Sequence, residues 1–181
     1  GAAITPDMAE KDVVLALARR LQKELETRGI PATLLRNSDI AISLDQRAVS
    51  ANAERPAMYV ALHAANTGSG VHVFTSMIDA NGANSREFLP WEQAQSAYVE
   101  ASTALADSVM AELVLRKLPN MLLAAPLRPM NNIAAPSIAI EIASPSDQVA
   151  DIAKPAYQLQ VAQAIAEGIA AVRSKGREVH P

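Results

Sequence analysis

The sequence predicts a three-layer α/β fold, in which a mostly parallel or mixed central sheet is flanked by helices. Short apolar runs typical of buried strands alternate along the chain with longer segments of helical periodicity. The 181 residues are 50% hydrophobic and 19% charged, enough for one domain with a sizeable core. No internal repeat or linker divides the chain. We therefore expect a single domain over residues 1–173 and a polar tail over residues 174–181.

The first half of the chain predicts two helices and three strands. Apolar residues recur at helical spacing over residues 11–28, and Gly29 follows them as a stop signal. A second helix is expected over residues 44–52. The expected strands are residues 30–35, 58–63 and 71–76.

The second half predicts two more helices and one more strand. Residues 79–90 are polar and without a period, which indicates a long surface loop bordering a cleft. The longest helical pattern spans residues 91–118 and ends at Pro119. An irregular Pro-rich segment follows. Residues 137–142 then predict an apolar strand, and residues 157–173 a last helix.

Charge and composition exclude several classes of function. A formal net charge of −3 gives no general electrostatic reason to bind nucleic acid or anionic lipid. The absence of cysteine excludes disulfides and thiolate metal sites. No apolar run approaches the roughly 20 residues of a membrane span, and the first residues lack the pattern of a signal peptide.

Three ionisable residues are candidates for chemistry. His63 ends a predicted strand, where functional groups gather in open α/β sheets, although a lone histidine there is more often structural. Glu141 lies in an apolar strand, where an unpaired carboxylate needs a metal, a cation or an opening into a cleft. Glu10 precedes the first long helix, where a carboxylate is also favoured by the helix dipole alone. Together they offer zinc ligands and a spare general base.

The order of several short motifs resembles the zinc-dependent N-acetylmuramoyl-L-alanine amidases of bacterial cell-wall turnover. The resemblance runs through nearly the whole chain. It rests on Glu10-Lys11-Asp12-Val13-Val14-Leu15, Arg36 with Asp39, Leu44 with Arg47, Ala51-Asn52, Leu62-His63-Ala64, Gly70-Val71-His72-Val73 and Pro136-Ser137-Ile138-Ala139-Ile140-Glu141.

This resemblance implies an amidase-like catalytic domain and a role for each candidate residue. Glu10 and His63 are expected to bind zinc, and Glu141 to be the catalytic carboxylate. The implied reaction is hydrolysis of the amide bond between N-acetylmuramic acid and L-alanine. The implied partner is peptidoglycan or its muropeptides, in the cell envelope, periplasmic or extracellular.

The sequence departs from the family pattern at two places. Ala61 and Ala65 stand where the family usually has Ser and Asn around the histidine, and Asn66 comes one position later. The family's first zinc ligand is a His in a Gly-His-Gly-Gly segment at the end of an initial strand, and this chain has no counterpart. We expect the third protein ligand upstream of Gly1. Loss of that strand also predicts self-association or reduced stability.

Other polar residues have a structural interpretation beside the functional one. Anchoring of a loop explains the charged residues Arg36, Asp39 and Arg47 at least as well as contact with a substrate does. His72 and His180 are poor substitute ligands, since one lies inside a strand and the other in a polar tail. Trp91 is expected to pack on the core rather than to stack on sugar.

Two alternatives to catalysis remain. A non-catalytic peptidoglycan-binding module with an amidase-like fold is favoured by the missing histidine, and the presence of Glu141 opposes it. A structural α/β domain acting through protein partners is the other alternative. A metal-free site without muropeptide binding would identify it.

Overall fold

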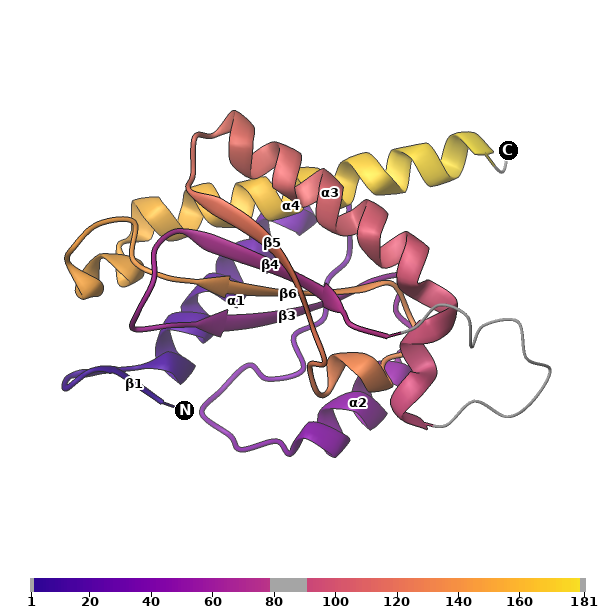
Figure 1. Cartoon of the computed structure of the whole chain (residues 1–181), viewed down its shortest axis with the longest axis horizontal. Coiled ribbons are helices and arrows are strands. Elements are labelled where there is room, and N and C mark those ends of the chain that lie inside the picture. The colour runs from indigo at the N-terminus through magenta and orange to yellow at the C-terminus, as the bar shows by residue number, and fades with distance from the viewer. Residues whose placement is uncertain (1, 79–90, 180–181) are drawn as a thin grey trace.

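A computed structural model describes residues 2–78 and 91–179, with the backbone alone at residues 91–93 and 175–179 (Figure 1). The loop predicted over residues 79–90 and the side chain of Trp91 lie outside this description.

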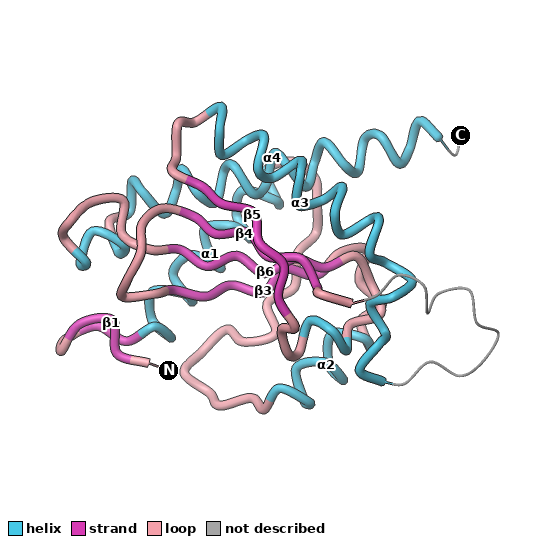
Figure 2. The backbone as a smooth tube through the Cα atoms, viewed as in Figure 1, coloured by secondary structure: helices cyan, strands magenta, loops and turns pink. Residues whose placement is uncertain are grey.

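A mixed four-stranded sheet forms the centre of the molecule (Figure 2). Its strands are β3 (Tyr59–Ala64), β6 (Ser137–Ile142), β4 (Val71–Ser76) and β5 (Asn120–Ala125), in that spatial order. β3 is parallel to β6 and β4 is parallel to β5, whereas β4 and β6 are antiparallel. The predicted α/β class with a mixed central sheet is confirmed.

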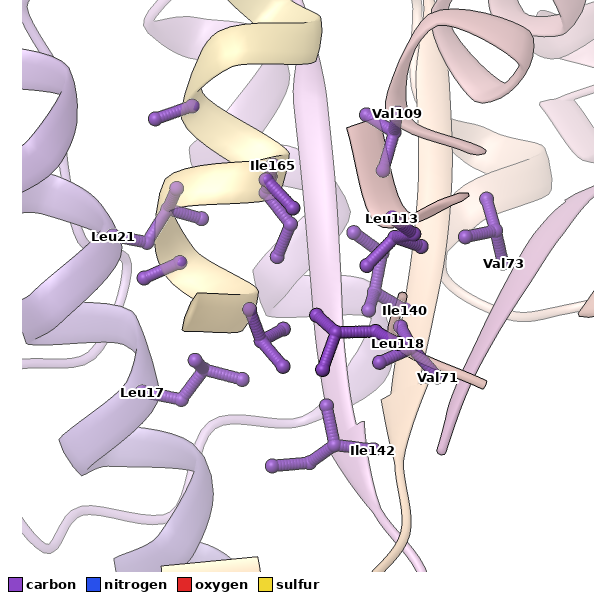
Figure 3. Close-up of a cluster of buried hydrophobic side chains, with 14 of the residues drawn as sticks. Leu17, Leu21, Val71, Val73, Val109, Leu113, Leu118, Ile140, Ile142 and Ile165 are labelled. Atoms are coloured by element: carbon purple, nitrogen blue, oxygen red, sulfur yellow. The ribbon is translucent and has the colours of Figure 1, made fainter. Parts of the chain in front are cut away.

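Helices α1 (Glu10–Thr27), α3 (Val99–Leu115) and α4 (Pro155–Val179) cover one face of the sheet. Their apolar stripes meet Val71 and Val73 of β4 and the isoleucines of β6 in the main core (Figure 3). On the opposite face, α2 (Leu44–Ala53) packs with Tyr59 and Ile133 in a smaller cluster. Because side chains alternate along a strand, the residues between the core positions point to this second face.

Local signals in the sequence set the ends of the first two helices. Gly29 follows α1 with a φ of +67°, and the N–H groups of Gly29 and Ile30 cap the last carbonyls of the helix. Ser43 and Gln46 form a capping box at the start of α2. Both helices therefore lie where the sequence predicts them.

The prediction of a strand over residues 30–35 is wrong. These residues form no strand, although Ile30 and Ala32 still pack on the main core. A strand forms only when a neighbouring strand pairs with it. Residues 30–35 lie across a cavity from β3, and no described segment pairs with the outer edge of that strand. Pro31 also lacks a backbone donor.

The single helix predicted over residues 91–118 is divided in two. A 3₁₀ helix, η2 (Trp91–Tyr98), precedes α3, which ends at Leu115. The buried side chain of Gln95 donates hydrogen bonds to the carbonyl groups of Ile133 and Ala135, and so ties η2 to the segment before β6. The apolar period of this segment predicts a buried stripe of Ala94, Tyr98, Leu105, Val109 and Leu113. The three members in α3 are fully buried, whereas Ala94 and Tyr98, which lie in η2, are only partly buried.

Three features escaped prediction. Strand β5 occupies part of the segment expected to be irregular, and β1 (Ala3–Thr5) pairs with β2 (Met8–Ala9) before α1. Helix α4 continues beyond Arg173 to Val179, into the segment expected to be a tail. β5 depends on pairing with β4, the β1–β2 hairpin on pairing between very short segments, and the end of α4 on helix propagation, and none of these gives a local apolar period.

Candidate functional site

Three ionisable side chains form one row across the second face of the sheet. His63 of β3 is the direct partner of Glu141 on β6, and Glu141 is the direct partner of His72 on β4. Residues directly opposite on neighbouring strands point to the same face. This face is the one away from α1, α3 and α4, so a carboxylate in an otherwise apolar strand avoids the main core.

Glu10 meets His63 at the carboxyl end of β3. Glu10 is the first residue of α1, and its Oε1 lies 3.4 Å from Nδ1 of His63. The two side chains remain partly accessible, at 24% for Glu10 and 44% for His63. The structure thus brings together the two residues predicted to bind zinc, although most of α1 and all of α2 lie between them in the sequence.

Glu141 meets His72 rather than standing alone. Oε1 of Glu141 lies 3.4 Å from Nδ1 of His72, and the Glu141 side chain is 34% exposed. From the sequence alone His72 is a poor substitute ligand, because its direction within a strand is fixed. That direction places it beside Glu141, and the antiparallel register of β4 with β6 was needed to see this.

The Glu10–His63 pair fits two positions of a zinc site. With metal–ligand bonds of about 2.0–2.1 Å, two ligand atoms of a tetrahedral zinc ion lie about 3.3 Å apart. The 3.4 Å between Oε1 of Glu10 and Nδ1 of His63 matches this spacing. Within the described residues, no group of three His, Cys, Asp or Glu side chains is placed to hold a metal.

A cavity of about 910 Å³ begins at this pair and follows β3. Every residue of β3 from Tyr59 to His63 lines it, and residues 30–36 line its other side. Glu141 and His72 are not among its lining residues. Burial of the Tyr59 ring raises the pKa of its hydroxyl, which stays protonated and uncharged at neutral pH.

The loop beside Glu10 is anchored by charged residues that the sequence singled out. Lys11 forms an ion pair with Asp39, and the hydrogen bond from Lys11 is the main cause that lowers the pKa of the Asp39 carboxyl. Arg36 donates to the carbonyl groups of Lys11 and Ser38. Arg47 donates to the carbonyl group of Ile42. These contacts agree with loop anchoring, one of the two interpretations of Arg36, Asp39 and Arg47, and all three residues also line the cavity.

Comparison with known sequences gives one family and a small set of relatives. Residues 1–171 match the pattern of the N-acetylmuramoyl-L-alanine amidase family. The N-acetylmuramoyl-L-alanine amidase AmiC of Escherichia coli O6:H1 is 30% identical over 202 aligned positions, covering 92% of this chain and 48% of the relative. AmiC of Neisseria meningitidis serogroup B is 34% identical over 101 positions, covering 52% of this chain and 23% of the relative. The chain therefore spans about half or less of the curated relatives it matches.

Solved structures of amidases share the fold. The chain is similar to the amidase AmiC2 of Nostoc punctiforme, with a TM-score of 0.74 and 23% identity over 96% of this chain and 89% of that one. It is similar to Ami1 of Mycobacterium smegmatis with the same score and identity, over 97% of this chain and 82% of that one. At this identity the likeness concerns the fold alone. The sequence match over residues 1–171 shows the family as well as the fold. This chain belongs to the N-acetylmuramoyl-L-alanine amidase family.

Proposed function

We propose that the protein containing this chain hydrolyses the amide bond between N-acetylmuramic acid and L-alanine of the peptidoglycan stem peptide, and that it uses zinc. The observation that carries the proposal is the convergence of Glu10, His63 and Glu141 at the carboxyl ends of β3 and β6. Two of these residues offer ligand atoms at the spacing of a zinc site. The third is a carboxylate beside them for proton transfer.

Glu10 and His63 would hold the metal ion, with a third protein ligand from residues preceding Gly1. When bound there, zinc would supply a Lewis acid that activates water and polarises the amide carbonyl. The carboxylate of Glu10 belongs to α1 and the imidazole of His63 belongs to β3, and folding brings the two groups together. Their partial exposure leaves the pair accessible to a substrate.

Glu141 would act as the general base and then as the general acid. It is the direct neighbour of His63 in the sheet register, and it is partly exposed on the same face. In this role the carboxylate accepts the proton of the attacking water and later returns it to the leaving amine.

The substrate and the location follow from the same reaction. The substrate class is peptidoglycan or its soluble muropeptides, and the reaction releases the stem peptide from the glycan. We place this activity in the cell envelope, periplasmic or extracellular. Within the described part of the chain, no helix combines the length and the apolar composition needed to cross a bilayer.

The test is a Glu141→Gln substitution in a version of the protein that includes the residues preceding Gly1. Removal of the base should lower muropeptide turnover by about 10²- to 10⁴-fold, while circular dichroism shows an unchanged fold. Glu26→Gln is the matched control, because Glu26 is an exposed carboxylate at the far end of α1. Turnover near the wild-type rate in a folded Glu141→Gln protein would remove Glu141 from the mechanism.

A peptidoglycan-binding module is the second candidate, and one observation favours it. Among residues 2–78 and 91–179, no third His, Asp or Glu side chain joins the Glu10–His63 pair in an arrangement that could hold a metal. Such a module would bind muropeptides and leave them intact, even in the longer version with zinc present. Cleavage by that version excludes this candidate.

A further inference from the structure

His72 has no role in the mechanism above, although it lies beside the proposed general base Glu141. The two residues are direct partners in the antiparallel ladder between β4 and β6, and Nδ1 of His72 lies 3.4 Å from Oε1 of Glu141. His72 is 21% exposed, less than Glu141. A half-buried imidazole thus borders the carboxylate on the side opposite His63.

The ring of His72 is held in its orientation by its surroundings. Phe74, two residues along the same strand, contacts it edge to face, with ring centroids 6.4 Å apart and planes at 80°. Gly68 lies on another side of the ring, where a Cβ added to it would be in ordinary van der Waals contact with Cε1 of His72 at 3.5 Å. A ring restrained in this way is suited to orient a neighbouring group.

The two oxygens of Glu141 are in different environments. Oε1 has His72 beside it, whereas Oε2 accepts no hydrogen bond from any described residue. A glutamate side chain has several rotatable bonds, and a base must be held within hydrogen-bond reach of the proton that it takes. Anchoring one oxygen removes that freedom and leaves the other available to water.

We propose that His72 is a positioning residue for Glu141, donating a hydrogen bond from Nδ1–H to Oε1 so that Oε2 receives the proton of the attacking water. The proposal rests on the proposed function of Glu141. It assigns the Nδ1-protonated tautomer to His72. It also gives a role to a histidine that lies outside the predicted zinc ligands.

The kinetic test uses two substitutions of His72 in the longer, active version. His72→Leu keeps bulk and removes the donor, whereas His72→Asn keeps a donor near the position of Nδ1. We expect His72→Leu to lower kcat about 10- to 100-fold, the range seen when a group that orients a functional residue is lost, with KM little changed. His72→Asn should recover most of kcat. Met121→Ala is the matched control, because Met121 is the β5 partner of His72 in the same row.

The outcomes separate this inference from the proposed function. Loss of turnover in Glu141→Gln together with normal turnover in His72→Leu would overturn the inference alone, as would equal losses in His72→Leu and His72→Asn. Normal turnover in Glu141→Gln would overturn both. Nitrogen NMR of His72 in the 181-residue chain is independent of activity and of how the variants fold. It should show the proton on Nδ1 in the unsubstituted chain, and a proton on Nε2 alone would refute the hydrogen bond.

Discussion

Glu10 and His63, the proposed metal ligands, come from two elements that meet only in the folded chain. Their 3.4 Å separation suits zinc, but two protein ligands are fewer than the three of a catalytic zinc site. We therefore expect the 181-residue chain to bind zinc weakly. A version that includes the residues preceding Gly1 should bind at least about tenfold more tightly, a difference of 1.4 kcal/mol or more.

Isothermal titration calorimetry of both versions measures this difference. His63→Ala should abolish the remaining binding in the shorter chain, and His72→Asn is the control, because His72 contacts Glu141 instead of Glu10. Equally tight binding by the two versions would mean that another residue of this chain supplies the third ligand. Loss of that binding in His72→Asn would identify it.

At the scale of elements, the contact between α3 and α4 depends on a glycine. A Cβ added at Gly168 would lie 2.7 Å from the Cα of Val109, a backbone atom that has no side-chain freedom to move away. The close approach also lets Ser108 donate to the carbonyl group of Gly168 at 3.0 Å. The packing of α4 on α3 therefore requires a residue without a side chain at this position.

We expect Gly168→Ala to destabilise the fold despite the better helix propensity of alanine. Overpacking costs about 1–3 kcal/mol, against a gain of roughly 1 kcal/mol in propensity. The melting temperature should fall by a few degrees, at about 2–4 °C per kcal/mol for a chain of this size. Thermal denaturation checks this, with Gln160→Ala on the exposed side of α4 as the control. An unchanged or higher melting temperature would show that the two helices separate without cost.

At the scale of the whole molecule, β3 is an edge strand whose outer side is not paired with any described strand. The N–H groups of Tyr59 and Ala65 donate to the carbonyl groups of Pro136 and Ile142 in the direction of β6. Backbone groups alternate in direction along a strand, so those of Val60 and Leu62 point toward the cavity, where no described strand pairs with them. An open edge of this kind favours pairing with another chain.

We propose that the 181-residue chain self-associates or is less stable than the version that includes the residues preceding Gly1. Light scattering and thermal denaturation of both versions measure the effect. If pairing of β3 contributes a few kcal/mol, we expect the melting temperature of the shorter chain to be several degrees lower. β5 is the other edge strand and exposes Met121, so Met121→Lys controls for association through that side. A shorter chain that is monomeric and equally stable would show that its sheet needs no further strand.

Local patterns in the sequence determined much of the fold. Helix α1 with its stop at Gly29, α2 with its cap, and strands β4 and β6 lie where periodicity and end signals predict them, because these signals act between residues close in the chain. The order of motifs also indicated the family and the three residues Glu10, His63 and Glu141.

Tertiary structure decided what depends on neighbours distant in sequence. Residues 30–35 have the apolar pattern of a strand but no partner, whereas β5 becomes a strand because β4 lies beside it. His72 meets Glu141 only because β4 runs antiparallel to β6 in one register, and a shift by one residue would turn its side chain to the other face. Strand pairing is a contact between remote segments, so its order and register are absent from any local pattern of the chain.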